Sequence, residues 1–213
     1  MNHRSARAVK LRVEDATLDG RLTIPPEATA LIVLVNGQWG IRYASRETEV
    51  AAALRDRGFG TLLVELLTPE EDGDRDCRFA IDLHASRLAG VTDWLDRQHR
   101  TADMPRGFLG VGPGVATALR AVSHHDSESR AVVGVDGRVD LGADALAATT
   151  IPTLLLVDTD QAHLMRSHTE AYDDLDESAH RHVVLRSVVG ADGTASTDVV
   201  ALASDWFRTH LSP

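Results

Sequence analysis

Short apolar runs alternate with longer amphipathic segments along the chain. The runs lie at residues 30–35, 60–66, 107–111, 131–135, 153–157 and 182–188, and each is rich in Val and Leu. Unbroken apolar runs of this length are typical of strands buried on both faces, as in a parallel sheet. The segments between them carry apolar residues at helical spacing, as in the stripe Ile81, Ala85, Leu88, Val91 and Leu95. The pattern therefore predicts alternating strands and helices.

This alternation predicts an α/β fold with a mainly parallel central sheet and helices on both faces. Residues 11–24 differ, and we expect two short strands that turn at Asp19-Gly20 and form an antiparallel N-terminal edge. One helix is expected to begin at a Ser45 cap and to end at Gly58. No linker or repeat interrupts the pattern, so we expect a single domain over residues 1–213 with residues 1–10 as a flexible segment.

Composition narrows the choice of partners and compartment. The net charge of −10 disfavours nucleic acid and anionic membranes, which both require a basic surface. Cys77 is the single cysteine, so no internal disulfide can form, and a reducing cytoplasm fits best. Residues 1–15 lack the apolar core of a secretory signal, and the run at 31–35 is too short to cross a bilayer. We expect a cytoplasmic protein.

A glycine-rich turn, Gly110-Val-Gly-Pro-Gly114, separates an apolar run from a helical segment. In a dinucleotide-binding fingerprint Gly110 and Gly112 would fill the first two glycine positions, but Val115 stands at the third. The turn also follows the third strand of the parallel part, whereas the fingerprint belongs to the first. The frame matches the nucleophile elbow G-x-S-x-G better, with Gly112 in the place of the nucleophile.

The chain as a whole resembles the dienelactone hydrolase-like branch of the α/β-hydrolase superfamily. The stretches that carry the resemblance are residues 31–71, 87–95, 109–119, 132–141 and 152–164. Their order and spacing span roughly residues 10 to 210. The resemblance implies an α/β-hydrolase fold with the catalytic residues in loops at the carboxyl ends of the strands.

The resemblance also implies that the hydrolytic machinery is incomplete. Gly112 stands where the family has Ser or Cys, and the next residue, Pro113, has no backbone N–H for an oxyanion. The family's base lies in a G-A-x-H loop, which reads Gly190-Ala191-Asp192-Gly193 here, and no His occurs between His182 and His210. Of the family's catalytic positions only the acid is kept, as Asp160. We therefore expect no catalytic residue, and Gly112, Pro113, Asp160 and Gly193 are vestigial positions.

A ligand site is expected to persist where the active site would be. It comprises Asn36, Gln38, Trp39, Gly112, Asp136, Arg138, Asp160 and Asp192. Two of these residues have a simpler interpretation, since Arg138 could pair with Asp140 and Trp39 could pack over the core. We expect the partner to be a small molecule or a protein, and we expect no cofactor and no binding to nucleic acid or membranes. The sequence is also compatible with a homodimer.

Two alternatives keep an enzymatic function. A lyase, isomerase or cyclase could use Asp136, Asp160 or Asp192 as acid or base. A hydrolase of esters or lactones would need a nucleophile from an unexpected loop. A metal site is not expected, because the pair His163 and His168 misses the spacing of four residues that a helical metal pair requires.

Overall fold

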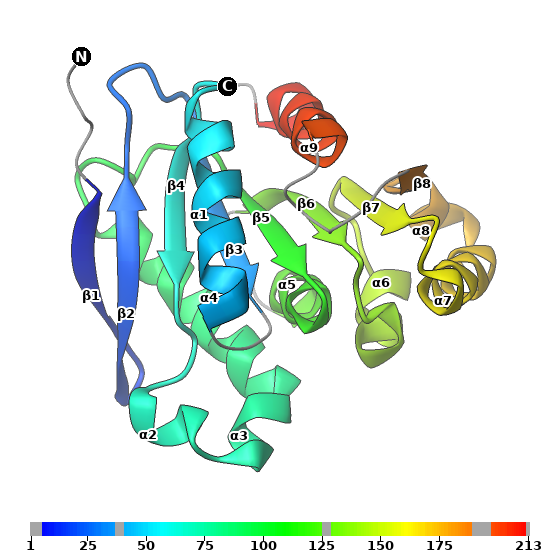
Figure 1. Cartoon of the computed structure of the whole chain (residues 1–213), viewed down its shortest axis with the longest axis horizontal. Coiled ribbons are helices and arrows are strands. Elements are labelled where there is room, and N and C mark those ends of the chain that lie inside the picture. Colours follow the sequence, from blue (N-terminus) through cyan, green and yellow to red (C-terminus); the bar gives the residue numbers. More distant parts are fainter. Residues whose placement is uncertain (1–5, 37–40, 125–128, 189–196, 212–213) are drawn as a thin grey trace.

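The computed structural model describes residues 6–36, 41–124, 129–188 and 197–211 and shows one sheet of eight strands in the order β1-β2-β4-β3-β5-β6-β7-β8 (Figure 1). The strands are β1 (Arg7–Val13), β2 (Ala16–Thr23), β3 (Leu31–Asn36), β4 (Gly60–Val64), β5 (Arg106–Val111), β6 (Ser129–Val135), β7 (Thr153–Asp158) and β8 (Val183–Val188). The strands from β4 to β8 pair in parallel, and β1 and β2 pair antiparallel at one edge. The α/β fold with an antiparallel N-terminal edge is confirmed.

Helices cover both faces of the sheet (Figure 1). They are α1 (Ile41–Arg55), α2 (Pro69–Asp72), α3 (Arg75–Phe79), α4 (Ile81–Asp96), α5 (Pro113–His124), the 3₁₀ turn η1 (Val139–Gly142), α6 (Ala143–Ala147), α7 (Ala162–Asp173), α8 (Glu177–His180) and α9 (Thr197–His210). Apolar residues of α1 and α9 form one core layer with the sheet, and those of α4, α5, α6 and α8 form the other. Neighbouring residues of β6 show the division, since Val132 faces the α5 layer and Val133 the α9 layer. Both faces of the parallel strands are buried, which explains their unbroken apolar runs.

The N-terminal hairpin turns earlier than the sequence pattern predicts. Its strands are joined at Glu14-Asp15, where Glu14 has a φ of 51°, and Asp19-Gly20 lies inside β2. Gly20 serves close packing instead, because a Cβ there would lie 2.8 Å from Cδ1 of Leu11 on β1. The hairpin also begins at Arg7, so the last four residues of the segment expected to be flexible belong to the sheet.

Helix α1 begins at Ile41, and Ser45 lies inside it instead of capping it. None of residues 41–44, Ile-Arg-Tyr-Ala, breaks a helix, so the helix extends back to the glycine that precedes it in the sequence. The predicted stripe on α4 is confirmed for Ala85, Leu88, Val91 and Leu95, which are buried.

An ion pair between the buried Arg87 and the partly exposed Glu71 fixes the short helix α2 onto α4. The guanidinium of Arg87 on α4 donates to both carboxylate oxygens of Glu71, at 2.5 and 2.6 Å, and to the carbonyl of Leu66 at 2.8 Å. Glu71 also closes a capping box with Thr68, accepting from its backbone N–H at 2.8 Å. Only 3% of the Arg87 side chain is exposed, so these contacts replace its water.

Within the described ranges, no helix is both long and apolar enough to cross a membrane.

Candidate functional site

The glycine-rich turn forms a sharp junction between β5 and α5. Gly110, near the end of β5, allows the helix to approach, because a Cβ there would lie 2.6 Å from the carbonyl oxygen of Gly114. Gly112 follows the strand with a φ of +54°, a left-handed conformation that glycine adopts without strain. A Cβ at Gly112 would have no described atom within 4 Å. The elbow geometry is therefore present, and no described atom occupies the position where a nucleophilic side chain would stand.

Hydrogen bonds join this elbow to the end of β6. The N–H of Gly112 donates to the carbonyl of Val135 at 3.1 Å, and the carbonyl of Gly112 accepts from the N–H of Arg138 at 3.0 Å. Pro113 is the first residue of α5, a position that suits proline because its N–H would have no partner within the helix. An acyl oxygen at the elbow would consequently lack one backbone donor that an oxyanion hole requires.

Asp136, directly after β6, has a strained backbone and a half-buried carboxyl group. Its φ is 46°, uncommon for a residue with a side chain. Its carboxylate Oδ1 accepts from the N–H of Asp158 at 2.8 Å, which joins the ends of β6 and β7. Burial raises the pKa of Asp136, and the negative charge of Asp158 raises it further. Strain and a perturbed carboxyl together are common at functional sites.

Asp158 is a buried acid that the sequence analysis missed in favour of Asp160. It is the last residue of β7 and is 6% exposed, whereas Asp160 lies exposed in the loop beyond. The Asp158 carboxylate accepts from the N–H of Asp160 at 3.0 Å and shapes that loop. Asp158 could have been identified from the sequence as a candidate site residue, because it ends an apolar run and ligands bind beyond the carboxyl ends of buried parallel strands.

His168, on α7, is completely buried near these acids. Its Nδ1 lies 2.8 Å from the carbonyl of Leu164, so Nδ1 carries the proton, because a carbonyl can only accept. Burial lowers the pKa of His168, although Asp136 and Asp140 act in the opposite direction. Nε2 is left as an acceptor without a partner among the described residues. A buried acceptor of this kind is costly and calls for an explanation.

Arg138 forms an ion pair with Asp140, which the sequence analysis gave as the alternative to a role in ligand binding. Nε and Nη2 of Arg138 donate to the two carboxylate oxygens of Asp140 at 2.8 and 2.7 Å. This bond holds the pKa of Asp140 below its ordinary value. Both side chains are more than 40% exposed, so the pair contributes little to stability.

The structure brings part of the predicted ligand site together. Gly112, Asp136, Arg138 and Asp160 meet at the carboxyl ends of β5, β6 and β7, linked through the backbone bonds described above. The backbone of Asn36 pairs with Val111 beside them at the end of β3. Gln38, Trp39, Asp192 and Gly193 lie outside the described residues. No cluster of three or more His, Cys, Asp or Glu side chains suited to a metal ion occurs in the described part of the chain.

The same architecture occurs in solved α/β-hydrolases. A dienelactone hydrolase of Anabaena variabilis is 34% identical, with a TM-score of 0.89 over 99% of this chain and 100% of that chain. The chain belongs to the dienelactone hydrolase family. An esterase of Pyrococcus furiosus shares the fold at 12% identity, with a TM-score of 0.75 over 98% of this chain and 92% of the esterase.

This chain is also similar to a longer protein of Mycobacterium tuberculosis that is provisionally named a phosphoribosyl transferase. It is 37% identical over 193 residues, 90% of this chain. The chain spans 44% of the length of that relative. No protein-family model matches the chain.

Replacing Asp136 with Asn is expected to stabilise this dienelactone hydrolase family member at neutral pH. A raised pKa means that folding disfavours the charged carboxylate, so stability falls as the pH rises through that pKa. The amide keeps an oxygen for the N–H of Asp158 and tolerates the positive φ better. We expect a gain of about 0.5–1 kcal/mol in the free energy of unfolding at pH 7, measured by urea denaturation.

Asp140→Asn is the matched control for this prediction. It removes a charge whose pKa is lowered, so it should leave stability unchanged or slightly reduced. A loss of stability in Asp136→Asn would show that its carboxylate is a structural group.

Proposed function

We propose that this chain binds a small molecule at the elbow without hydrolysing it. The observation that carries the proposal is Gly112, which keeps the left-handed conformation of the nucleophile position and leaves open space in place of a side chain. Pro113 supports it, since the first residue of α5 offers no N–H to an oxyanion. Each of these losses alone costs orders of magnitude in rate.

The charges at the elbow favour a neutral or cationic ligand. Asp136, Asp158 and Asp160 supply carboxylates at the ends of β6 and β7, and Arg138, which is bonded to the elbow through its backbone, has its guanidinium paired with Asp140. A phosphorylated sugar would bring more negative charge to this region. The name of the mycobacterial relative therefore does not carry over to the elbow, and that name belongs to a protein more than twice as long.

Hydrolysis of 4-nitrophenyl acetate by the purified chain tests the absence of hydrolytic chemistry. We expect a rate equal to that of the buffer. The variant carrying Gly112→Ser, Pro113→Ala and Gly193→His is expected to gain weak esterase activity, because it restores nucleophile, N–H donor and base together. Turnover by the unaltered chain that persists through further purification would refute the proposal.

Binding is tested separately with a neutral lactone, dihydrocoumarin, followed by calorimetry. We expect saturable binding with the lactone recovered intact. Gly112→Asn should abolish this binding, because Asn tolerates the positive φ of Gly112 and its side chain would occupy the open space. Equal binding by Gly112→Asn would place the lactone elsewhere.

The strained, half-buried Asp136 favours one further candidate, an enzyme that moves protons without hydrolysis. A carboxyl group with a raised pKa is suited to general acid or base work near neutral pH, and the buried His168 lies within its electrostatic range. Such an enzyme would catalyse deuterium exchange at the carbon next to a ketone, measured by NMR in D₂O. The exchange should disappear in Asp136→Asn, and its absence from the unaltered chain excludes this candidate for the ketones tested.

A further inference from the structure

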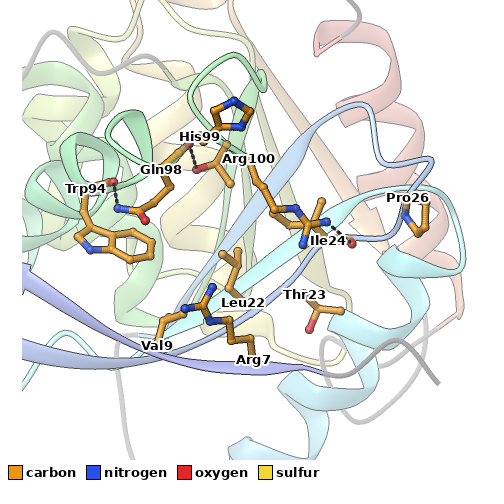
Figure 2. Close-up of a pocket in the computed structure, with 11 residues that line it drawn as sticks. Arg7, Val9, Leu22, Thr23, Ile24, Pro26, Trp94, Gln98, His99 and Arg100 are labelled. Atoms are coloured by element: carbon orange, nitrogen blue, oxygen red, sulfur yellow. Dashed lines mark hydrogen bonds between the residues drawn. The ribbon is translucent and has the colours of Figure 1, made fainter. Parts of the chain in front are cut away.

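A pocket of about 440 Å³ is lined by residues of β1, of β2 and of the turn after α4 (Figure 2). None of its described lining residues belongs to the elbow. It opens between the hairpin of β1 and β2 and the turn that follows α4. Its walls include Leu22 and Ile24 from the hairpin and Trp94 from the last turn of α4. Small-molecule sites usually range from about 300 to 1,000 Å³, so the volume suits a compact organic ligand.

The side chains that line this pocket include two arginines and a histidine. Arg7, His99 and Arg100 contribute nitrogen donors, and no acidic residue is among the described residues of the lining. The chain as a whole has a net charge of −10, so a pocket lining without described acidic residues differs from the average surface. Arg7 forms no ion pair with any described acid, so its guanidinium keeps its donors for a ligand.

Arg100 is positioned by one contact and keeps further donors. Its Nη2 donates to the carbonyl of Ile24 at 3.3 Å, which ties the turn after α4 to the hairpin. A guanidinium has five N–H donors, so most of them stay available. In Figure 2 the side chains of Arg7 and Arg100 extend from opposite walls of the pocket. Guanidinium groups bind carboxylate and phosphate through charge-assisted hydrogen bonds, so an anion is the ligand that these two side chains favour.

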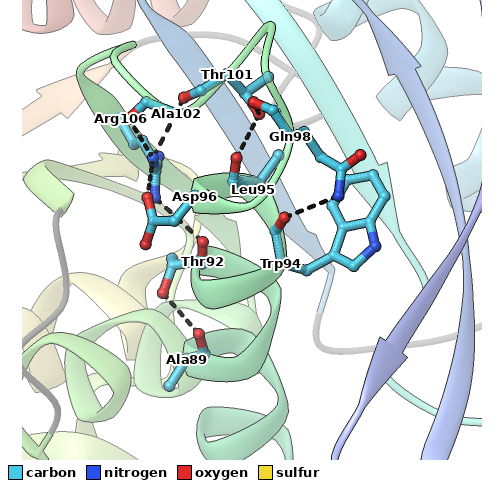
Figure 3. A network of polar contacts seen from close by, with 9 residues as sticks. All are labelled: Ala89, Thr92, Trp94, Leu95, Asp96, Gln98, Thr101, Ala102 and Arg106. Carbon is cyan, nitrogen blue, oxygen red and sulfur yellow. Dashed lines mark hydrogen bonds and ion pairs between the residues drawn. The ribbon is translucent and has the colours of Figure 1, made fainter.

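A buried arginine holds the wall that carries His99 and Arg100 (Figure 3). Arg106 is 1% exposed, and its guanidinium donates to the carbonyls of Thr92, Thr101 and Ala102 at 3.2, 3.3 and 3.4 Å and to the carboxylate of Asp96. The hydroxyl of Thr101 donates to the carbonyl of Leu95 at 2.6 Å. These bonds fix the turn before a ligand arrives, which reduces the entropy lost on binding.

Apolar surface lies beside the basic groups. Trp94 packs against the core and is partly exposed, and Val9, Leu22, Ile24 and Pro26 add further apolar surface to the lining. An indole ring favours flat apolar groups and offers an N–H at its edge. The pocket therefore combines an apolar platform with cationic donors.

We propose that this pocket binds an organic anion, in which a carboxylate or phosphate contacts Arg7 and Arg100 and a flat apolar body lies against Trp94. The site is separate from the elbow and does not depend on the function proposed there. An anion is disfavoured at the elbow by its carboxylates and favoured here, so the two sites select ligands of opposite charge.

Calorimetry with the whole chain tests the proposal, using 2-naphthoate and 2-naphthyl phosphate as probes. We expect one saturable site for at least one probe, and the tighter probe identifies the anionic group. The neutral analogue 2-naphthylmethanol should bind at least about tenfold more weakly, since it cannot form charge-assisted hydrogen bonds. Equal binding of the neutral analogue, or no saturable binding of either anion, would overturn the proposal.

Arg7→Gln and Arg100→Gln should each weaken binding of the anion by about tenfold, because each removes one charged donor. Both side chains are exposed, so neither variant should unfold. Arg12→Gln is the matched control, since Arg12 is exposed on the same strand as Arg7 outside the pocket, and it should bind like the unaltered chain. Unchanged affinity in both pocket variants would place the anion elsewhere, and so would competition by dihydrocoumarin for the same site.

Discussion

Gly110→Ala is expected to destabilise the fold by about 2–4 kcal/mol, although it adds a single methyl group. The new Cβ would lie 2.6 Å from the oxygen and 2.8 Å from the carbon of the Gly114 carbonyl, and 2.8 Å from the nitrogen of Val115. All three contacts are with backbone, so no side chain can rotate away. Relief requires α5 to move off β5, and α5 buries Val115, Ala118 and Leu119 in the core.

Gly112→Ala, two residues further along, is the matched comparison. Its Cβ would meet no described atom within 4 Å, so the cost is that of a left-handed conformation, about 1–2 kcal/mol. Urea denaturation of both variants measures the difference. If Gly110→Ala cost no more than about 1–2 kcal/mol, the amount expected for Gly112→Ala, the strand and helix would not approach each other as closely as described.

Glu71→Gln is expected to lower the free energy of unfolding by about 3–5 kcal/mol, because it leaves the charge of Arg87 buried without its carboxylate. Hydrogen bonding to Arg87 lowers the pKa of Glu71 from 4.5 to about 2.

The pH dependence of stability gives this prediction a second test. A lowered pKa in the folded state means that the stabilisation is complete above about pH 4.5 and is lost as the pH falls toward about 2. The difference between the unaltered chain and Glu71→Gln should therefore shrink on acidification. Glu70→Gln is the control, since Glu70 is exposed on the same helix, and it should behave like the unaltered chain at every pH. A constant difference between pH 7 and pH 3 would show that Glu71 contributes through its shape and not its charge.

The parallel strands could be predicted from the sequence because burial on both faces leaves an unbroken apolar run, as in residues 153–157. The position of the hairpin turn could not be predicted, because Asp19-Gly20 is a strong turn signal in the sequence. In the structure Leu11 pairs with Leu18, so its side chain lies next to Gly20, which is small enough to accommodate it. Local turn preference yields there to the packing of the edge strands.

The candidate site residues also divide into those visible in the sequence pattern and those that depend on tertiary packing. Gly112 and Asp136 could be found because they follow apolar runs, and parallel strands carry their functional loops at the carboxyl ends. His168 could not, because it comes from the middle of α7 and approaches the acids only through tertiary packing. The basic pocket was missed for the same reason, as Arg7 and Arg100 are 93 residues apart and meet only when the hairpin docks against α4.

Under the function proposed above, binding without hydrolysis, Pro113 also affects how readily hydrolysis could evolve at the elbow. Proline at the start of α5 restricts the unfolded chain and suits the first helical position, so it stabilises the fold while it withholds the oxyanion donor. A reversion that restores the N–H would give up that stabilisation and gain no activity until a nucleophile and a base were also present. Selection for stability would therefore oppose this replacement of the proline, unless a nucleophile and a base were already in place.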